Sequence, residues 1–172
     1  MQTSAARLSE RMLEEGQRVV EFYRALGPDE LAHTLYADGA QWTVGQLLCH
    51  LVSAEQSMTR LVEGILGGGS GSPEDFDLDR YNERKVAALA GVAPEALLEQ
   101  YWAARQASAA LAAHLEPQQL QMQGRHPFLG MACVEDILKL MYRHNQVHLR
   151  EVRRALAGAE PQDNPALEGG GA

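Results

Sequence analysis

VEDILKLMYRHNQVHLREVRRALA, residues 134–157, carries apolar side chains at the spacing of one helix face, about 3.6 residues apart. At about 100° per residue, His144 and His148 lie together on the flank of this face, and Glu151 lies close to the same line. The stretch therefore predicts a core helix that directs two imidazoles at its neighbours. The predicted core positions are Val134, Ile137, Leu138, Met141, Val152 and Leu156.

Three further segments show helical periodicity, at about residues 4–26, 43–66 and 79–115. They are rich in Ala, Leu, Glu, Arg and Gln, which favour helices. The third segment is expected to break near Pro94, a residue suited to the first turn of a helix. Four helices around one core predict an all-α fold, an antiparallel four-helix bundle, in which binding sites form between facing helices.

The segment at residues 43–66 has clear boundaries. Thr43 and Gln46 form a capping box at its start, and Trp42 is positioned to pack over the first turn. The sequence GGGSGSPEDFD at residues 67–77 ends the helical pattern. It lacks the Gly-Lys-Ser/Thr that closes a phosphate-binding loop, and it follows a helix rather than a strand. We therefore expect a flexible loop there.

The length of 172 residues suits one domain. We assign the bundle to residues 1–157. Residues 158–172 have the composition of a disordered segment and are expected to form a flexible tail. The connection at residues 116–133 is expected to be a short hairpin or an irregular crossing.

Composition argues against several classes of function. The 15 basic and 23 acidic residues give a formal net charge of −8, which is unusual for a protein that binds nucleic acid. No apolar run reaches the roughly 18 residues that span a membrane, and no secretory segment opens the chain. Cys49 and Cys133 alone do not make a disulfide framework, so the reducing cytoplasm is the expected location.

A third imidazole completes a candidate metal site. His50 lies on the flank of the apolar face of residues 43–66, and it can meet His144 and His148 if the two helices pack side by side. Three neutral histidines with one open position form a known catalytic arrangement around a divalent ion. The spacing alone is weak evidence, because an H-x-x-x-H pair on a helix is more often incidental.

Other reactive side chains have simpler interpretations. Cys49 is expected to be a buried structural thiol, and Cys133 a residue of a helix start, where the pKa of a thiol can fall. His126 either lines the mouth of the site or binds the backbone of a turn. Glu151 is a weak candidate for a catalytic base. Glu55 is a further acid or base candidate, with ion pairing as its simpler role.

Three stretches together resemble the DinB-like superfamily. WTVGQLLCHLVSAE at residues 42–55 resembles its second helix, with Trp-Thr at the start and a His-Leu pair. FDLDRYNERKVAAL at residues 76–89 resembles an Asp-x-x-Asn segment that often follows. HPFLGMACVEDILKLMYRHNQVHLREV at residues 126–152 resembles the closing segment, in which a His-Pro-x-x-Gly turn leads into an H-x-x-x-H helix. The resemblance covers about residues 5–157.

This resemblance implies a DinB-like bundle, often a homodimer, that binds a divalent ion, commonly zinc or nickel, through three histidines. Carried over residue by residue, these ligands are His50, His144 and His148. Some relatives are S-transferases or isomerases that use a low-molecular-weight thiol. The sequence departs from the commonest pattern at Asn145, where an acidic residue is frequent, and at Glu151, where Gln is frequent.

Two functions remain open from the sequence, besides a plain helical scaffold in which the three histidines lie far apart or form hydrogen bonds elsewhere. The first is a metal-dependent enzyme acting on a small molecule, either an S-transferase with a low-molecular-weight thiol as cosubstrate or a hydrolase. In both reactions the ion would lower the pKa of a thiol or of water. The second is a non-catalytic, stress-related bundle that binds a metal or a small ligand. A coordination sphere closed by a fourth protein ligand would favour the second function.

Overall fold

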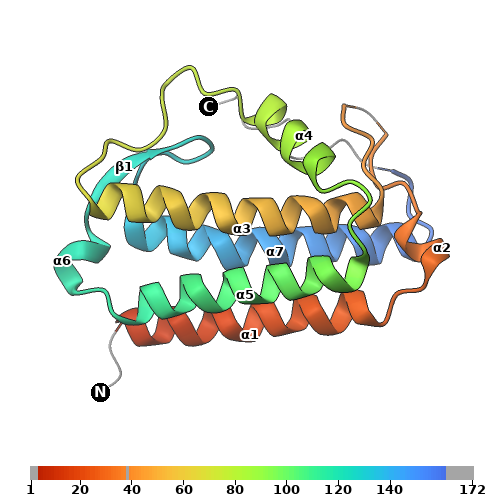
Figure 1. Ribbon diagram of the computed structural model, residues 1–172, viewed down its shortest axis with the longest axis horizontal. Helices are drawn as coiled ribbons and strands as arrows, with labels where there is room; N and C mark the ends of the chain where they lie inside the picture. The colour runs from red at the N-terminus through yellow and green to blue at the C-terminus, as the bar shows by residue number, and fades with distance from the viewer. Residues whose placement is uncertain (1–3, 38, 162–172) are drawn as a thin grey trace.

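A computed structural model describes residues 4–37 and 39–161, and four long helices form its body (Figure 1). The bundle helices are α1 (Ser4–Arg24), α3 (Val44–Leu66), α5 (Pro94–Ala113) and α7 (Val134–Leu156). The connections contain α2 (Pro28–Leu31), α4 (Leu78–Ala88), α6 (Pro117–Leu120) and an antiparallel hairpin of β1 (Gln123–His126) and β2 (Gly130–Cys133). The structure confirms the predicted helical bundle and the hairpin. Most of the predicted tail, from residue 162 on, lies outside the described residues.

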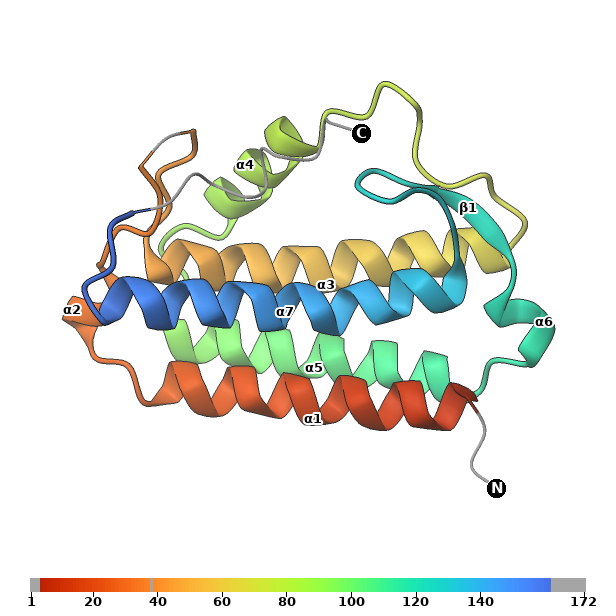
Figure 2. The ribbon, with the colours of Figure 1, turned by 180° about the vertical axis from the view of Figure 1, so that it is seen from behind.

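The four bundle helices do not simply alternate in direction along the chain. α1 and α3 each pack against both α5 and α7. Figures 1 and 2 show that α1 and α7 run in one direction while α3 and α5 run in the other. The pairs α3 with α7 and α1 with α5 are therefore antiparallel, as predicted, whereas α3 and α5 are parallel neighbours. The cause is α4, which packs against α3 and carries the chain back to the end where α3 began.

The segment predicted as the third helix divides into two helices. α4 ends at Ala88, and α5 begins at Pro94. Between them, Gly91 has a φ of 82°, which a glycine adopts without steric strain. Pro94 stands in the first turn, as predicted. Backbone N–H groups there have no partner within the helix, so the absence of an N–H in proline costs no hydrogen bond. Because the chain changes direction at this break, α4 lies outside the bundle and α5 lies within it (Figure 1).

A buried polar layer separates two apolar clusters inside the bundle. On α7, for example, Met141 belongs to one cluster and Leu149 to the other. Each bundle helix places a buried polar residue between the clusters: Glu15 on α1, Glu55 on α3, Arg105 on α5 and Asn145 on α7. Nη2 of Arg105 lies 2.7 Å from Oε2 of Glu55, and both side chains are at most 1% exposed. The layer therefore contains an ion pair fully removed from water.

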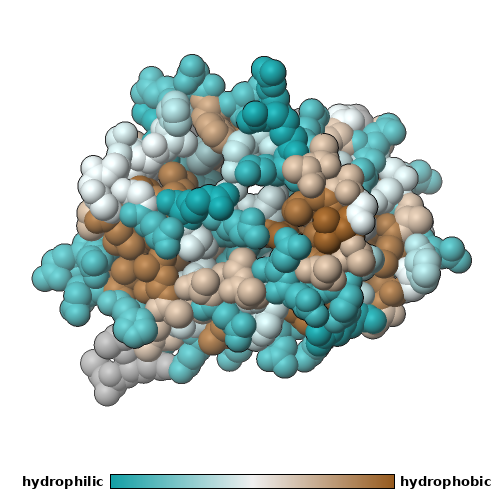
Figure 3. Space-filling view, viewed as in Figure 1, coloured by the Kyte–Doolittle hydropathy of each residue, from teal (hydrophilic) through white to brown (hydrophobic). Residues whose placement is uncertain are grey.

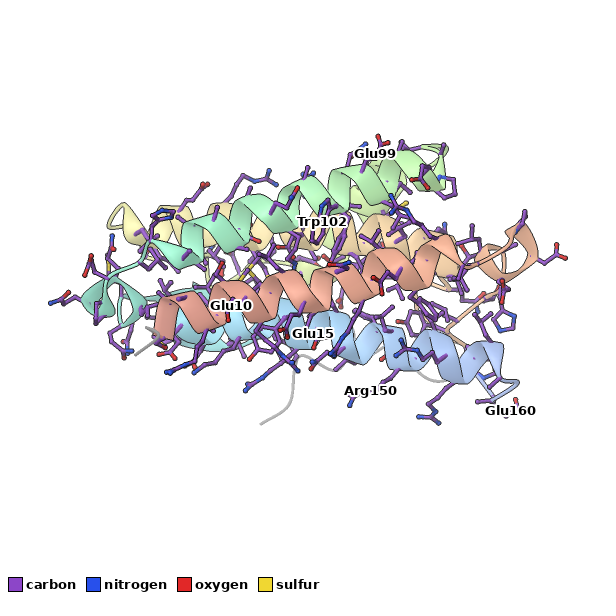
Figure 4. The ribbon with its side chains drawn as sticks, turned by 90° about the horizontal axis from the view of Figure 1, so that it is seen from below. Glu10, Glu15, Glu99, Trp102, Arg150 and Glu160 are labelled. Carbon is purple, nitrogen blue, oxygen red and sulfur yellow. The ribbon has the colours of Figure 1, made fainter. Side chains whose placement is uncertain are left out.

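Gly16 lets α1 approach α5 beside this layer. A Cβ atom at Gly16 would lie 2.6 Å from Cγ of Arg105 and 3.3 Å from the ring of Trp102. Figure 4 shows Trp102 on α5 facing α1, and Glu15 on α1 near α7. A glycine inside a helix costs about 1 kcal/mol relative to alanine. Here the absence of a side chain at Gly16 leaves room for the aliphatic part of buried Arg105 between the helices.

The bundle helices keep polar faces toward solvent. On α7, Arg150, Arg153 and Arg154 are exposed, and the last two lie in the final turn, where positive charge interacts favourably with the helix dipole. Within the part of the chain that the structure describes, none of the helices combines the length and the apolar character needed to cross a membrane.

α4 and the hairpin lie on one side of the bundle, over α3 and α7 (Figures 1 and 2). Gly124 brings β1 against α3, because a Cβ atom there would collide with Ile65. The N–H of Arg125 donates to Ser70 O, and the N–H of Ser72 donates to Arg125 O, at 2.8 Å each. The Gly-rich segment is thus a loop, as predicted, but one that pairs with β1. Together these segments cover the groove between α3 and α7.

Candidate metal centre

Three imidazoles meet in the groove between α3 and α7. Nε2 of His144 lies 3.0 Å from Nε2 of His50 and 3.0 Å from Nε2 of His148. One ring nitrogen from each residue lies within 4.8 Å of the other two. Nitrogen ligands at about 2.0–2.1 Å from a tetrahedral ion are roughly 3.3 Å apart, so small shifts would accommodate an ion. The structure therefore brings together the three histidines that the sequence singled out.

Glu151 and Tyr36 fix the ring of His148. Oε2 of Glu151 accepts hydrogen bonds from Nδ1 of His148, at 2.8 Å, and from the hydroxyl of Tyr36, at 2.9 Å. A proton on Nδ1 leaves the lone pair of Nε2 directed at the other two rings. Burial and then the charge of Glu151 raise the pKa of Tyr36, so its hydroxyl stays a donor. Metal-binding histidines commonly show this arrangement, with a carboxylate holding the far nitrogen.

The loop between α2 and α3 supplies Tyr36 and Trp42 to the site. The N–H of Leu35 donates to Trp42 O at 2.9 Å, which pairs the two arms of the loop. The predicted capping box starts α3 directly after this pairing, with Thr43 as the cap. The rings of Trp42 and His50 lie 5.0 Å apart between centroids, with 32° between their planes. Trp42 is thus a packing residue, as predicted, and it packs against His50, a candidate metal ligand.

Burial keeps His50 and His144 neutral. Desolvation lowers the pKa of both rings well below the usual value, and the neighbouring His148 ring lowers it further. Nδ1 of His50 and Nδ1 of His144 are buried without a hydrogen-bond partner among the described residues. These Nδ1 atoms point away from the place where the Nε2 atoms meet, so an ion bound by the Nε2 atoms would not contact them. Neutral imidazole nitrogens suit zinc, nickel or copper, and the three residues therefore fit a divalent ion.

A cavity of about 490 Å³ opens beside the three histidines. Its floor is the groove between α3 and α7, and α4, the loop at residues 72–76 and the hairpin turn cover it. Its volume is in the range of small-molecule sites. Among residues 4–37 and 39–161, no Cys, Asp or Glu joins the histidine cluster at ligand spacing. The open side of the cluster thus faces space for a small molecule.

His126 combines the two roles predicted as alternatives. It lines the cavity, and its Nδ1 accepts hydrogen bonds from the backbone N–H groups of Phe128, at 3.1 Å, and Leu129, at 3.3 Å. Both bonds require Nδ1 to be unprotonated, because a protonated imidazole offers only donors. Burial lowers the pKa of His126 to about 4. The neutral ring therefore holds the hairpin turn over the cavity.

Protonation of His126 is expected to destabilise the fold in acid. The pKa of His126 is about 4 in the folded protein and near 6.5 in an unfolded chain. Between these values the unfolded chain binds more protons, so the stability falls as the pH is lowered. By pH 4.5 we expect the metal-free protein to lose about 2–3 kcal/mol through this residue. Urea unfolding at pH 7 and pH 4.5 measures the loss.

The matched variant is His126→Asn, whose side-chain oxygen can accept the same N–H groups and does not titrate. Its loss of stability between the two pH values should be smaller by that amount. An equal loss in both proteins would show that His126 does not titrate as the structure indicates.

The remaining candidates have structural roles. Cys49 is buried, as predicted, and its thiol donates to a backbone carbonyl. Cys133 stands at the start of α7, where its thiol donates to Asp136 at 3.2 Å, but burial raises its pKa, contrary to the lowering considered from the sequence. Glu55 forms the predicted kind of ion pair, with Arg105. None of these residues lines the cavity.

Sequence analysis missed Tyr36, which contacts both His148 and Glu151. A single loop residue has no periodicity, and its partners lie 112 and 115 positions away in the chain. The available signal was composition, because Leu35 and Tyr36 are large side chains in a short polar loop. Such residues are more often buried than exposed.

Comparison with known proteins agrees with this architecture. The sequence pattern of the DinB superfamily matches residues 14–152. Among solved structures, YfiT from Bacillus subtilis superposes with a TM-score of 0.71 at 18% identity, covering 93% of this chain and 91% of YfiT. YfiT is described as a probable metal-dependent hydrolase with an unusual four-helix bundle topology, and at this identity the likeness shows the fold. The sequence has no significant match among curated proteins. From the extent of the family match, the chain belongs to the DinB superfamily.

Proposed function

We propose that the protein is a metal-dependent enzyme whose divalent ion, zinc or nickel, is held by His50, His144 and His148. The observation that carries this proposal is the convergence of three ring nitrogens beside a cavity of small-molecule size. With three protein ligands, one coordination position remains for water or substrate, as in catalytic zinc sites. A bound ion of this kind lowers the pKa of water or of a thiol and supplies a nucleophile near neutral pH.

The side chains around the three histidines orient the ligands and exclude water. Tyr36 and Glu151 hold the ring of His148 in one tautomer. Trp42 covers one side of His50. Because Glu151 already accepts two hydrogen bonds, we assign it a positioning role instead of the catalytic base considered from the sequence.

We favour hydrolysis as the reaction. A cavity of about 490 Å³ has room for one drug-sized molecule, which suits water as the second reactant. The description of YfiT as a probable metal-dependent hydrolase supports the same choice. The second candidate is S-transfer with a low-molecular-weight thiol, which rests on the sequence resemblance. A closed structural site is less favoured, because the histidine cluster borders the cavity.

The test is turnover by protein stripped with a chelator and reloaded with zinc or nickel. Nitrophenyl esters report hydrolysis, and a chloro-dinitro arene with added thiols reports S-transfer. We expect ester hydrolysis that appears with the metal and disappears in His144→Ala. The control is His33→Ala, which removes an exposed imidazole and should keep full activity.

Two results would contradict the proposal. One is a lack of turnover with every combination of metal, ester and thiol. The other is turnover in His144→Ala equal to that of the unmodified protein, which would place the reaction away from the three histidines.

A further inference from the structure

The charges around the cavity differ from those of the whole chain. The chain has 23 acidic and 15 basic residues, yet no Asp or Glu lines the cavity, whereas Arg60 and Arg143 do. Neither arginine forms an ion pair with a residue that the structure describes. In a protein of net charge −8, this wall is a local positive region that attracts an anion.

Helix geometry sets the distance between the histidines and the far end of the cavity. On α3, His50, Ala54, Ser57 and Leu61 share one face and line the cavity. Seven residues separate His50 from Ser57, which places Ser57 about 10 Å farther along the helix axis. The cavity is therefore elongated, with the histidines at one level and Ser57 two turns away.

A polar cluster stands at this second level. Ser57 Oγ and the hydroxyl of Tyr81 are 2.7 Å apart, and Nη2 of Arg60 donates to Ser57 Oγ at 3.4 Å. Nζ of Lys85 lies 5.3 Å from the centre of the Tyr81 ring. Burial raises the pKa of Tyr81, but Ser57, Lys85 and Arg60 together outweigh burial and lower the pKa overall. The cluster thus favours negative charge.

Asn82 adds an available polar group to the same wall. It lines the cavity and is 8% exposed, and its side chain has no hydrogen-bond partner within residues 4–37 and 39–161. Its amide atoms are not among the fully buried ones and face the cavity, so a ligand with polar atoms can form hydrogen bonds with them. Asn82 belongs to the Asp-x-x-Asn segment, to which the metal centre gives no role.

Most of the remaining wall is apolar. Phe128 and Val147 are 52% and 38% exposed, and they are two of the four large apolar side chains with high exposure in the described chain. Both line the cavity, together with Met58, Leu61 and Phe76. Figure 3 shows apolar patches on the face that carries α4, surrounded by polar surface. An apolar body of a ligand would bury these side chains.

From the positive wall, the unpartnered amide and the apolar sides, we propose that the cavity binds an organic carboxylate. Its apolar body lies along Met58, Leu61 and Phe128. Its carboxylate accepts hydrogen bonds from Arg60, Tyr81 and Asn82. Its reacting group lies at the histidines, about 10 Å from the carboxylate. The placement of the reacting group rests on the proposed function, whereas carboxylate binding does not.

The test compares 4-phenylbutyrate with its neutral amide by calorimetry at pH 7.5. Metal-free protein is decisive, because a metal ion would itself attract a carboxylate. We expect the carboxylate to bind at least about tenfold more tightly than the amide, the effect of one charge-assisted hydrogen bond. In Arg60→Gln this preference should fall below about threefold. Arg60 is exposed, so the variant should fold normally.

The matched control is Arg24→Gln, which removes one positive charge from an exposed pair with Glu95. It should retain the full preference for the carboxylate. Equal binding of the two probes, or an unchanged preference in Arg60→Gln, would overturn the inference even if the protein binds a metal. Loss of metal binding with the preference intact would instead contradict only the proposed function.

Discussion

Alanine in place of His50, His144 or His148 is expected to lower the affinity for zinc or nickel by more than about 100-fold. Each change removes one of the three proposed nitrogen ligands, and no other His, Cys, Asp or Glu among the described residues stands at ligand spacing to replace it. Isothermal titration of chelator-treated protein without an affinity tag measures the affinity. Metal analysis of the purified proteins gives the stoichiometry.

Replacing the positioning residue should have a smaller effect. Glu151→Gln keeps a hydrogen-bond acceptor for His148 but removes the charge, and residues that support metal ligands typically contribute 10- to 100-fold in affinity. The control is His33→Ala, which removes an exposed histidine and should leave affinity unchanged. If the three alanine variants and His33→Ala lose affinity equally, the histidine cluster is not the binding site.

Replacing Glu55 with alanine is expected to lower the free energy of unfolding by about 3–5 kcal/mol. Glu55 binds Arg105 at 2.7 Å and accepts a hydrogen bond from Ser108. Without it, the guanidinium keeps one hydrogen bond, to Met141 O at 3.3 Å. Nε and Nη1 of Arg105 already lack partners among the described residues. The variant therefore leaves a buried charge without compensation, which urea unfolding measures.

Two controls separate the buried charge from the loss of a side chain. In the double variant Glu55→Leu with Arg105→Met, neither charge of this pair remains buried, and most of the stability should return. Glu95→Ala breaks the exposed pair with Arg24 and should cost less than about 1 kcal/mol. A cost for Glu55→Ala as small as that of Glu95→Ala would show that the buried pair does not hold the polar layer together.

The helices and the histidines could be predicted because both depend on local periodicity. Apolar spacing marked the buried face of α7, and Val134, Ile137, Leu138, Met141 and Val152 are all buried, whereas Leu156 in the last turn is partly buried. The same spacing placed the histidines on the flank of that face. Capping chemistry marked the start of α3 for a similar reason, since a cap is a contact between near neighbours in the chain.

The buried polar layer could not be predicted from local patterns. Arginine and glutamate are rarely fully buried, and no local pattern marked Arg105 as an exception. Its burial depends on Glu55, which lies 50 positions earlier in the chain. The burial of Asn145 also depends on a residue far away in the chain, because its amide donates to the hydroxyl of buried Tyr101 on α5. The departure from an acidic residue at this position thus affects the core.

The parallel arrangement of α3 and α5 also escaped sequence analysis. The break near Pro94 was visible, but the direction of α4 is set by its packing on α3 and by the hairpin that holds the loop before it. The cavity results from this crossover, since α4 and the hairpin cover the groove that contains the histidines. The homodimer, the cytoplasmic location and the small-molecule partner stay predictions.

X-ray absorption of protein loaded with one equivalent of zinc tests the metal centre most directly. The three-histidine site predicts scattering from three imidazole rings at about 2.0 Å and one lighter ligand that is not an imidazole. It also predicts that the spectrum of His50→Ala loses one ring. A spectrum with one imidazole or none, or one that is identical in His50→Ala, would contradict the site.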